Sequence, residues 1–175
     1  NEAAKTQVET VETNTQDNYI GLGIVGMGSS DEVIVAFDNE ATSNFDLQKD
    51  AQKFFSSSNL PNLAIRSDDD INLAINSLAL DGGGIDIPII VHSPSEGELQ
   101  LQILKAPIME HQTCISLEDL NTGISYDVFE TDTFTFYTAS VDEEHRFTLH
   151  IGESFNPSYE GVLCNGADDG SITVS

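Results

Sequence analysis

Residues 21–26, Gly-Leu-Gly-Ile-Val-Gly, have the glycine spacing G-x-G-x-x-G that binds the pyrophosphate of a dinucleotide. That chemistry requires a helix that begins at the motif, so that its first N–H groups face the phosphate. Here a short glycine- and serine-rich stretch leads directly into a β-branched run that starts at Val33, and no useful helix fits between them. Asp38 also comes too early to bind the ribose. We therefore interpret the segment as a strand, a glycine-rich turn and a second strand.

The acidic residues Asp46 and Asp50 are our candidate metal ligands. Calcium takes six to eight oxygen ligands, several of them from carboxylates on neighbouring loops. The competing interpretation is that these two carboxylates tie their own loop together by accepting backbone N–H bonds. The triplet at 68–70 is interpreted as a plain acidic loop. The predicted cofactor is therefore Ca²⁺ or none.

The other reactive side chains do not form a catalytic pattern. The sequence contains no G-x-S-x-G elbow, and no histidine has the H-E-x-x-H spacing of a zinc protease. Glu118 and Asp119 follow a predicted strand, but adjacent strand residues point to opposite faces and so cannot form a glycosidase pair. The histidines, each expected to be structural or solvent-facing, are His92, His111, His145 and His150. We predict that the protein is not an enzyme.

Charge and hydropathy exclude further classes of partner. Six Lys and Arg residues against 30 Asp and Glu give a net charge of −24, which repels nucleic acid. No apolar run approaches the roughly 20 residues of a membrane helix, so we expect no membrane insertion. We see no signal peptide and expect a segment from the interior of a longer chain. Cys114 lies in an apolar run and is expected in the core, whereas Cys164 lies in a different module; a disulfide between them is the less favoured alternative.

The elements that must position these residues are mostly strands, because apolar residues alternate along the chain with period two. One short helix is expected around 47–55, and Pro88 favours an edge or a bulge. The pattern predicts an all-β protein, an antiparallel β-sandwich of jelly-roll or immunoglobulin-like type. The predicted strands are 19–25, 33–37, 63–66, 71–78, 85–91, 99–104, 114–117, 125–129, 133–138 and 146–151.

Several motifs between residues 18 and 152, taken in order, resemble a β-rich region of large type IX-secreted surface proteins of Bacteroidetes. That region shows A-T-x-x-x-D-x-x-x-D-A, a proline before an apolar run, L-E-D-x-x-T-G, Y-T-F and R-F-x-L-H. The sequence T-F-T-F here is a departure from Y-T-F. The matching residues are Ala41-Thr42, Asp46, Asp50-Ala51, Pro88, Leu117-Glu118-Asp119, Thr122-Gly123, Phe134-Thr135-Phe136 and Arg146-Phe147-Thr148-Leu149-His150.

The segment from Cys164 to Val174 resembles the start of a SprB-type repeat of gliding-motility adhesins. We therefore predict a polar arm at 1–17, a β-sandwich domain at 18–152, and a linker with the first strand of a following repeat at 153–175. The resemblance implies an extracellular, cell-surface structural or adhesive module. Its implied partners are neighbouring domains of the same chain, and surface glycans or other surface proteins. The alternative is a carbohydrate-binding module, with or without calcium, that tethers an enzyme to a glycan.

Overall fold

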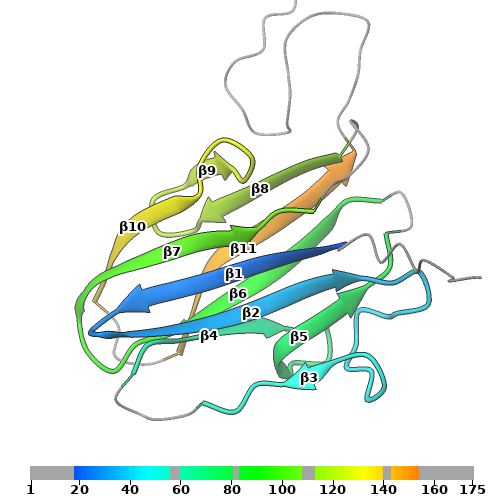
Figure 1. The fold of residues 1–175 in the computed structure, drawn as a ribbon, viewed down its shortest axis with the longest axis horizontal. Coiled ribbons are helices and arrows are strands. Elements are labelled where there is room, and N and C mark those ends of the chain that lie inside the picture. Colours follow the sequence, from blue (N-terminus) through cyan, green and yellow to red (C-terminus); the bar gives the residue numbers. More distant parts are fainter. Residues whose placement is uncertain (1–17, 56–59, 81–82, 108–112, 140–142, 154–175) are drawn as a thin grey trace, which may run out of the picture.

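The structure, a computed structural model, describes residues 18–55, 60–80, 83–107, 113–139 and 143–153 (Figure 1). The predicted arm at 1–17 and nearly all of the predicted segment at 153–175 lie outside these residues. Within them the chain forms strands and turns and contains no helix. The strands are β1 (Tyr19–Gly26), β2 (Ser29–Phe37), β3 (Ala51–Gln52), β4 (Asn62–Arg66), β5 (Asn72–Leu78), β6 (Ile85–His92), β7 (Gly97–Lys105), β8 (Thr113–Asp119), β9 (Ile124–Asp127), β10 (Thr133–Thr138) and β11 (Glu143–Glu153).

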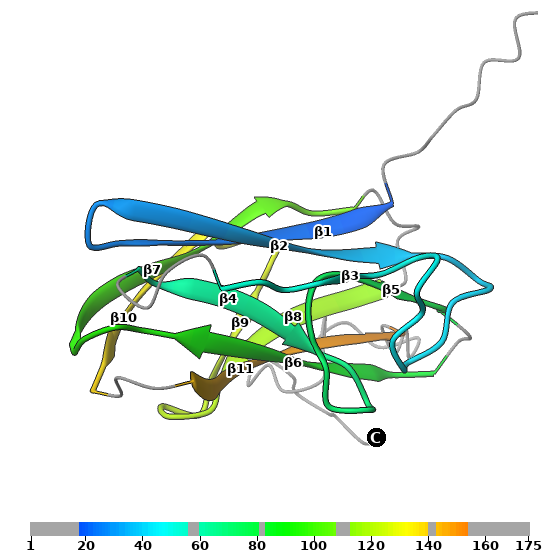
Figure 2. The same cartoon turned by 90° about the horizontal axis from the view of Figure 1, so that it is seen from below.

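The strands form one mixed sheet in the order β10-β7-β1-β2-β5-β4-β6-β11-β8-β9, with β3 paired to β5. The sheet curls into a half-barrel, and Figure 2 shows β1 and β2 on one side with β6 and β11 on the other. The all-β prediction is confirmed. The prediction of a purely antiparallel arrangement is wrong, because β2 and β5 run parallel, with Ile34 opposite Ile75. The long connection between these two strands permits the parallel pairing, which a hairpin would not.

The core lies inside the curl and is built by alternation along each strand. In β10 the side chains are exposed and buried in turn, as the sequence Thr-Phe-Thr-Phe-Tyr-Thr predicts. Phe136 of β10 packs edge-on against Phe147 of β11, with ring centroids 5.0 Å apart. Strands from opposite halves of the sheet order therefore share one core. Its fully buried aliphatic residues include Ile20, Leu22, Ile24, Leu63, Ile65, Leu101, Ile115, Leu117 and Leu149.

The glycine-rich segment at 21–26 forms β1 and leads into a two-residue turn, as the sequence predicts. Met27 and Gly28 have φ angles of 54° and 74°, the left-handed pair that closes a tight hairpin. Gly23 has a separate role on the outer face of β1. A Cβ atom there would lie 3.0 Å from Leu104 Cδ1 of β7, so the absence of a side chain lets Leu104 lie flat on the strand. The motif serves the hairpin and its packing.

The short helix expected at 47–55 is wrong. The chain makes one turn, in which Asp50 N–H donates to Asp46 C=O at 2.8 Å, and then enters β3. Ala51 pairs with Ile75 of β5, and Lys53 N–H donates to Asn72 C=O at 2.8 Å. Pairing with a neighbouring strand therefore replaces the hydrogen bonds that would have continued the helix.

Candidate functional site

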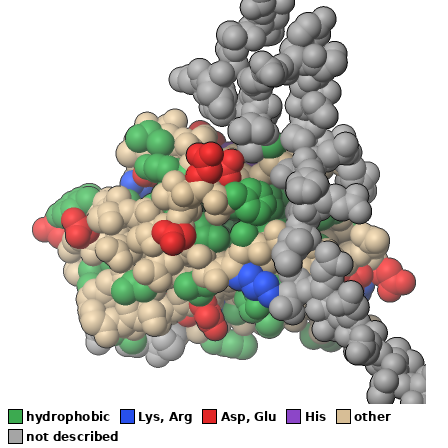
Figure 3. Space-filling view, turned by 45° about the horizontal axis from the view of Figure 1, so that its top comes forward, with side chains coloured by type: hydrophobic (Ala, Val, Ile, Leu, Met, Phe, Trp, Pro, Cys, Tyr) green, Lys and Arg blue, Asp and Glu red, His purple; other side chains and the backbone are tan. Residues whose placement is uncertain are grey.

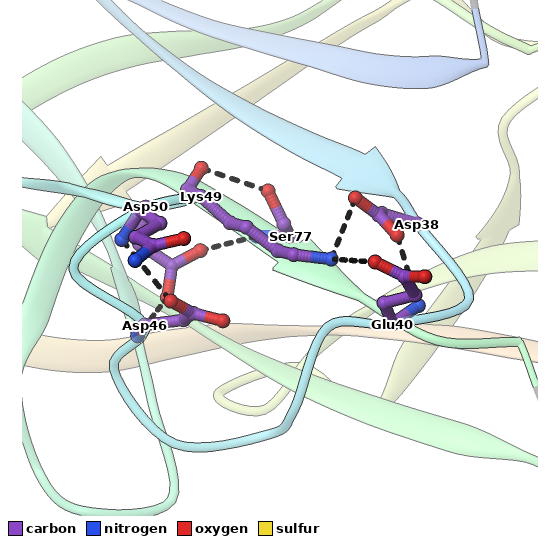
Figure 4. Close-up of polar contacts among 7 residues, drawn as sticks. Asp38, Glu40, Asp46, Lys49, Asp50 and Ser77 are labelled. Carbon is purple, nitrogen blue, oxygen red and sulfur yellow. Dashed lines mark hydrogen bonds and ion pairs between the residues drawn. The ribbon is translucent and has the colours of Figure 1, made fainter.

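The loop that carries Asp46 and Asp50 is tied together by these two carboxylates (Figure 4). The two oxygens of Asp50 accept backbone N–H bonds from Asp46 and from Ser77 of β5, each at 2.7 Å. Asp46 Oδ1 accepts from Gln48 N–H at 3.1 Å. This geometry is the loop-tying arrangement that the sequence offered as the alternative to metal binding. Calcium binding by Asp46 and Asp50 stays a prediction.

Lys49 supplies the positive charge beside this loop. Its Nζ lies 2.8 Å from Asp38 Oδ2 and 3.8 Å from Glu40 Oε2, and its C=O accepts a hydrogen bond from Ser77 Oγ at 2.9 Å (Figure 4). The Lys49 ammonium, helped by the Glu40 N–H, lowers the pKa of the Asp38 carboxyl below its usual range. Among the residues that the structure describes, no three His, Cys, Asp or Glu side chains gather in a way that could hold a metal ion.

Two acids of the triplet at 68–70 interact with neighbouring residues of the protein. Asp69 accepts hydrogen bonds from Ser67 Oγ at 2.6 Å and from Phe45 N–H at 3.0 Å, and these bonds lower the pKa of its carboxyl. Asp70 forms an ion pair with Arg66 at 2.6 Å. Two of the three acids therefore fix the turn between β4 and β5.

Asp119 and Arg146, from two motifs far apart in the sequence, form a buried ion pair. Arg146 Nε lies 2.8 Å from Asp119 Oδ1, and Nη2 donates to Oδ2 at 2.9 Å; the two side chains are 6% and 5% exposed. The guanidinium carbon lies 5.2 Å from the ring centroid of Phe136 and 5.7 Å from that of Phe147. Asp119 also accepts the Asn121 N–H at 3.0 Å. The pair joins the end of β8 to β11.

His150 of β11 connects the outer faces of three adjacent strands. Its Nδ1 lies 2.7 Å from Asp86 Oδ1 of β6, and its Nε2 lies 3.0 Å from Glu118 Oε2 of β8. Burial lowers the pKa of His150, but its hydrogen bonds to the Asp86 and Glu118 carboxylates outweigh the effect of burial, and the net pKa is raised. Glu118 and Asp119 thus serve opposite faces of β8, as their adjacency predicts, and each has a structural partner.

The other histidines also have local roles where the structure describes them. A bulge between His145 and Phe147 changes the register of β11 against β6, and His145 Nε2 lies 3.1 Å from Thr148 Oγ1. His92 packs against the ring of Phe55, with ring centroids 5.5 Å apart. His111 lies outside the described residues.

A polar cleft of about 400 Å³ opens between the end of β5 and the start of β6, and sequence reasoning missed it. At its wall Asn76 is 2% exposed, and within the described part of the chain its Oδ1 has no hydrogen-bond partner. A buried polar atom of this kind is uncommon in native proteins and calls for an explanation. The polar residues that line the cleft are Thr42, Ser43, Arg66, Asp68, Asn76 and Asp86. An asparagine in a predicted strand was the only sequence signal.

Cys114 on β8 is disulfide-bonded, contrary to the expectation of a simple core residue. The chain contains one other cysteine, Cys164, which lies outside the described residues.

Within the described part of the chain there is no helix with the length and apolar character needed to cross a bilayer. Comparison of the chain with protein-family models, curated proteins and solved structures gives no match. The resemblance to Bacteroidetes surface proteins therefore rests on the sequence motifs.

Proposed function

We propose that this chain is a non-catalytic structural or adhesive module of a large extracellular protein on a bacterial surface. The observation that carries the proposal is the use of its charged side chains. The acids and bases with the most promise for chemistry, Asp119 with Arg146 and Glu118 with His150, connect strands to one another. A catalytic acid or base needs a reacting group within reach, and these groups already occupy each other.

The absence of catalysis is tested by turnover. We expect no release of reducing sugar from a panel of surface polysaccharides and no cleavage of generic ester or peptide substrates. Turnover that is lost in Asp119→Asn or Glu118→Gln would contradict the proposal, because those residues would then act on substrate. The exposed variant Asp70→Asn, which alters an ion pair on another loop, is the matched control.

An extracellular location is supported by the disulfide at Cys114, because disulfides persist mainly in oxidising compartments. The acidic surface is also consistent with this location, since high net charge keeps an exposed protein soluble. On the face shown in Figure 3, acidic side chains are dispersed among apolar and uncharged ones.

The extracellular location is tested on intact cells. Antibodies against the domain should label these cells, and external protease should remove the label. Label that appears only after lysis would contradict the proposal.

The finer architecture that we propose is a β-sandwich of jelly-roll or immunoglobulin-like type. Supporting it, β5 borders β4 through residues 72–73 and β2 through residues 75–78, so the sheet can divide at this strand. The packing of Phe136 on Phe147 across the core is consistent with two facing layers. An experimental structure with a continuous hydrogen-bonded ladder and no facing layers would contradict it.

We propose type IX secretion, and a following SprB-type repeat, on the motif resemblance. The parent gene tests both: we expect tandem repeats with the Cys-Asn-Gly-Ala-x-Asp-Gly-Ser-Ile pattern downstream and a type IX sorting domain at the C-terminus of its product. A parent protein without an export signal would contradict this assignment. Calcium binding at Asp46 and Asp50 is tested separately. Millimolar calcium should raise the melting temperature of chelator-treated protein by mass action, and the double variant Asp46→Asn/Asp50→Asn should abolish the rise.

A second candidate function is carbohydrate binding, in which the module attaches a larger protein to a glycan. The observation that favours it is the polar cleft beside Asn76. Small-molecule sites are concave and combine apolar walls with a few polar groups, and the cleft has both kinds of lining. Retention of the protein on immobilised polysaccharide, released by free sugar, tests this function independently of the site.

A further inference from the structure

Asn76 occupies a position at which an apolar residue would be expected. It pairs in register with Val35 of the parallel strand β2, and paired residues on neighbouring strands share a face of the sheet. Val35 is fully buried in the core. Asn76 therefore points to the same side of the sheet as a core residue, but it lies where β5 borders the cleft.

The Asn76 amide is poorly satisfied for a group so deeply buried. Its Oδ1 has no partner among the described residues, and desolvation of an amide oxygen without a hydrogen bond costs free energy. A 180° flip of the amide exchanges its oxygen and its nitrogen, so the group that lacks a partner can be an acceptor or a donor. A ligand that reaches this amide would supply the missing bond.

The rest of the cleft presents hydrogen-bond acceptors. Asp68 and Asp86 contribute carboxylates, and Thr42 Oγ1 already donates to Asn44 C=O at 3.2 Å, which leaves its oxygen to accept. Among the described residues of the lining the cationic group is Arg66, which donates to Asp70 at 2.6 Å and to Asn72 at 2.8 Å. A ligand must therefore bring donors, and an anionic ligand is disfavoured by the charge of the whole chain.

A neutral sugar supplies hydroxyl groups as hydrogen-bond donors, and its binding does not depend on a strong electric field in the cleft. Asp86 lies 2.7 Å from His150, and Arg66 adds a positive charge to the lining, so the cleft presents little net negative charge to a cationic ligand. Leu78, Ile87 and Pro88 add apolar surface for the C–H faces of a sugar ring. We propose that the cleft between β5 and β6 binds a neutral saccharide of one or two units through Asn76, an inference that rests on the second candidate function.

The test is a titration of ¹⁵N-labelled protein followed by NMR, with the Asn76 side-chain amide as the reporter. The probes are glucose, galactose, mannose, xylose, N-acetylglucosamine, maltose and cellobiose at millimolar concentrations. Glucuronate serves as the anionic probe and N-acetyl-arginine amide as the cationic probe. We expect at least one neutral sugar to shift the Asn76 amide together with backbone signals of 41–43 and 84–88, and neither charged probe to do so.

The variant Asn76→Leu should lose affinity for that sugar by about tenfold or more, because a buried hydrogen bond is removed. Its melting temperature should not fall, since an unpaired buried polar atom is also removed. Asn121→Leu makes the same change in the exposed turn after β8 and should leave binding unchanged. Asp68→Ala, at an exposed residue of the lining, should weaken binding several-fold even if Asn76→Leu does not fold.

Three outcomes would overturn the inference, and they separate the site from the function. Sugar-dependent shifts confined to another surface, such as the hollow beside Gly23 and Gln102, would refute the site and leave carbohydrate binding standing. If no probe sugar shifts any signal, the site is refuted. If the protein is also not retained on immobilised polysaccharide, carbohydrate binding is refuted as well. Shifts of the Asn76 amide with N-acetyl-arginine amide alone would refute the class of ligand.

Discussion

Replacing Asp119 by alanine should strongly destabilise the domain, because it leaves the Arg146 guanidinium buried without its counter-charge. The wild-type carboxylate lies 2.8 Å from Arg146 Nε, accepts a hydrogen bond from Arg146 Nη2 at 2.9 Å, and accepts the Asn121 N–H at 3.0 Å. Removing one partner of a buried ion pair costs about 3–5 kcal/mol. The aromatic rings of Phe136 and Phe147 beside the guanidinium offer it only weak compensation.

The assay is equilibrium unfolding in urea, monitored by circular dichroism. Because a domain of this kind has a total stability of about 5–15 kcal/mol, Asp119→Ala should remove at least about a fifth of it and shift the urea midpoint to a clearly lower concentration. Asp119→Asn, which keeps the shape and the acceptor for Asn121, should lose less, about 1–3 kcal/mol. The double variant Asp119→Leu/Arg146→Met should recover most of the loss, since an apolar pair of similar volume replaces the charges.

The matched control is the exposed ion pair between Asp70 and Arg66. Its N–O distance is 2.6 Å, shorter than in the buried pair, but the two side chains are 82% and 28% exposed. Asp70→Asn, which keeps a residue suited to the left-handed φ of 66° at this position, should therefore cost less than about 1 kcal/mol. Equal losses for Asp119→Asn and Asp70→Asn would refute the reasoning, because the buried pair would then be as accessible to water as the exposed one.

Three further predictions follow from the hydrogen bonds and backbone angles described above. The raised pKa of His150 contributes stability that is fully present below its unfolded pKa of about 6.5 and is lost as pH rises through the folded pKa. The stability difference between wild type and His150→Asn should therefore be larger at acidic than at alkaline pH, and a difference that does not change with pH would contradict it. Gly28→Ala should cost about 1 kcal/mol by thermal melting, because φ is +74° and the added Cβ meets nothing within 4 Å, so the backbone strain acts alone. Asp50→Ala removes the acceptor for the N–H groups of Asp46 and Ser77 and should lower the free energy of unfolding by about 1–3 kcal/mol. Hydrogen exchange at the Ser77 amide should accelerate, and unchanged protection of that amide would show that another group replaces the carboxylate.

Much of the strand content was predictable, because period-two alternation is a local property of the chain. The run Thr-Phe-Thr-Phe-Tyr-Thr at 133–138 was predicted residue for residue as β10, and the turn at Met27 and Gly28 was expected from its glycine-rich context. The parallel pairing of β2 with β5 was not predictable, since each strand has the same pattern in either orientation. The segment 47–55 was misread because its first hydrogen bonds are those of a helical turn, and only its contact with β5 ends them.

The candidate sites were predicted less well than the fold. Asp46 and Asp50 lie in one loop, where Asp50 accepts the backbone N–H of Asp46 as the loop-tying interpretation expects, and calcium binding there stays a prediction. The association of Asp119 with Arg146, 27 positions apart, depends on β8 lying beside β11, which is a property of the whole sheet. Asn76 has no distinguishing spacing at all; its interest arises from a missing hydrogen bond, which no linear sequence displays.

The position of β11 has a consequence for the order in which the domain can form. This last strand of the described domain lies between β6 and β8 and pairs with both along its length. A chain made from its N-terminus therefore presents two unpaired strand edges until its final strand arrives, and unpaired edges promote association with other chains. The sheet is complete only when residues 143–153 pair between strands made much earlier. Until then, a nascent form of the protein exposes both edges to its neighbours.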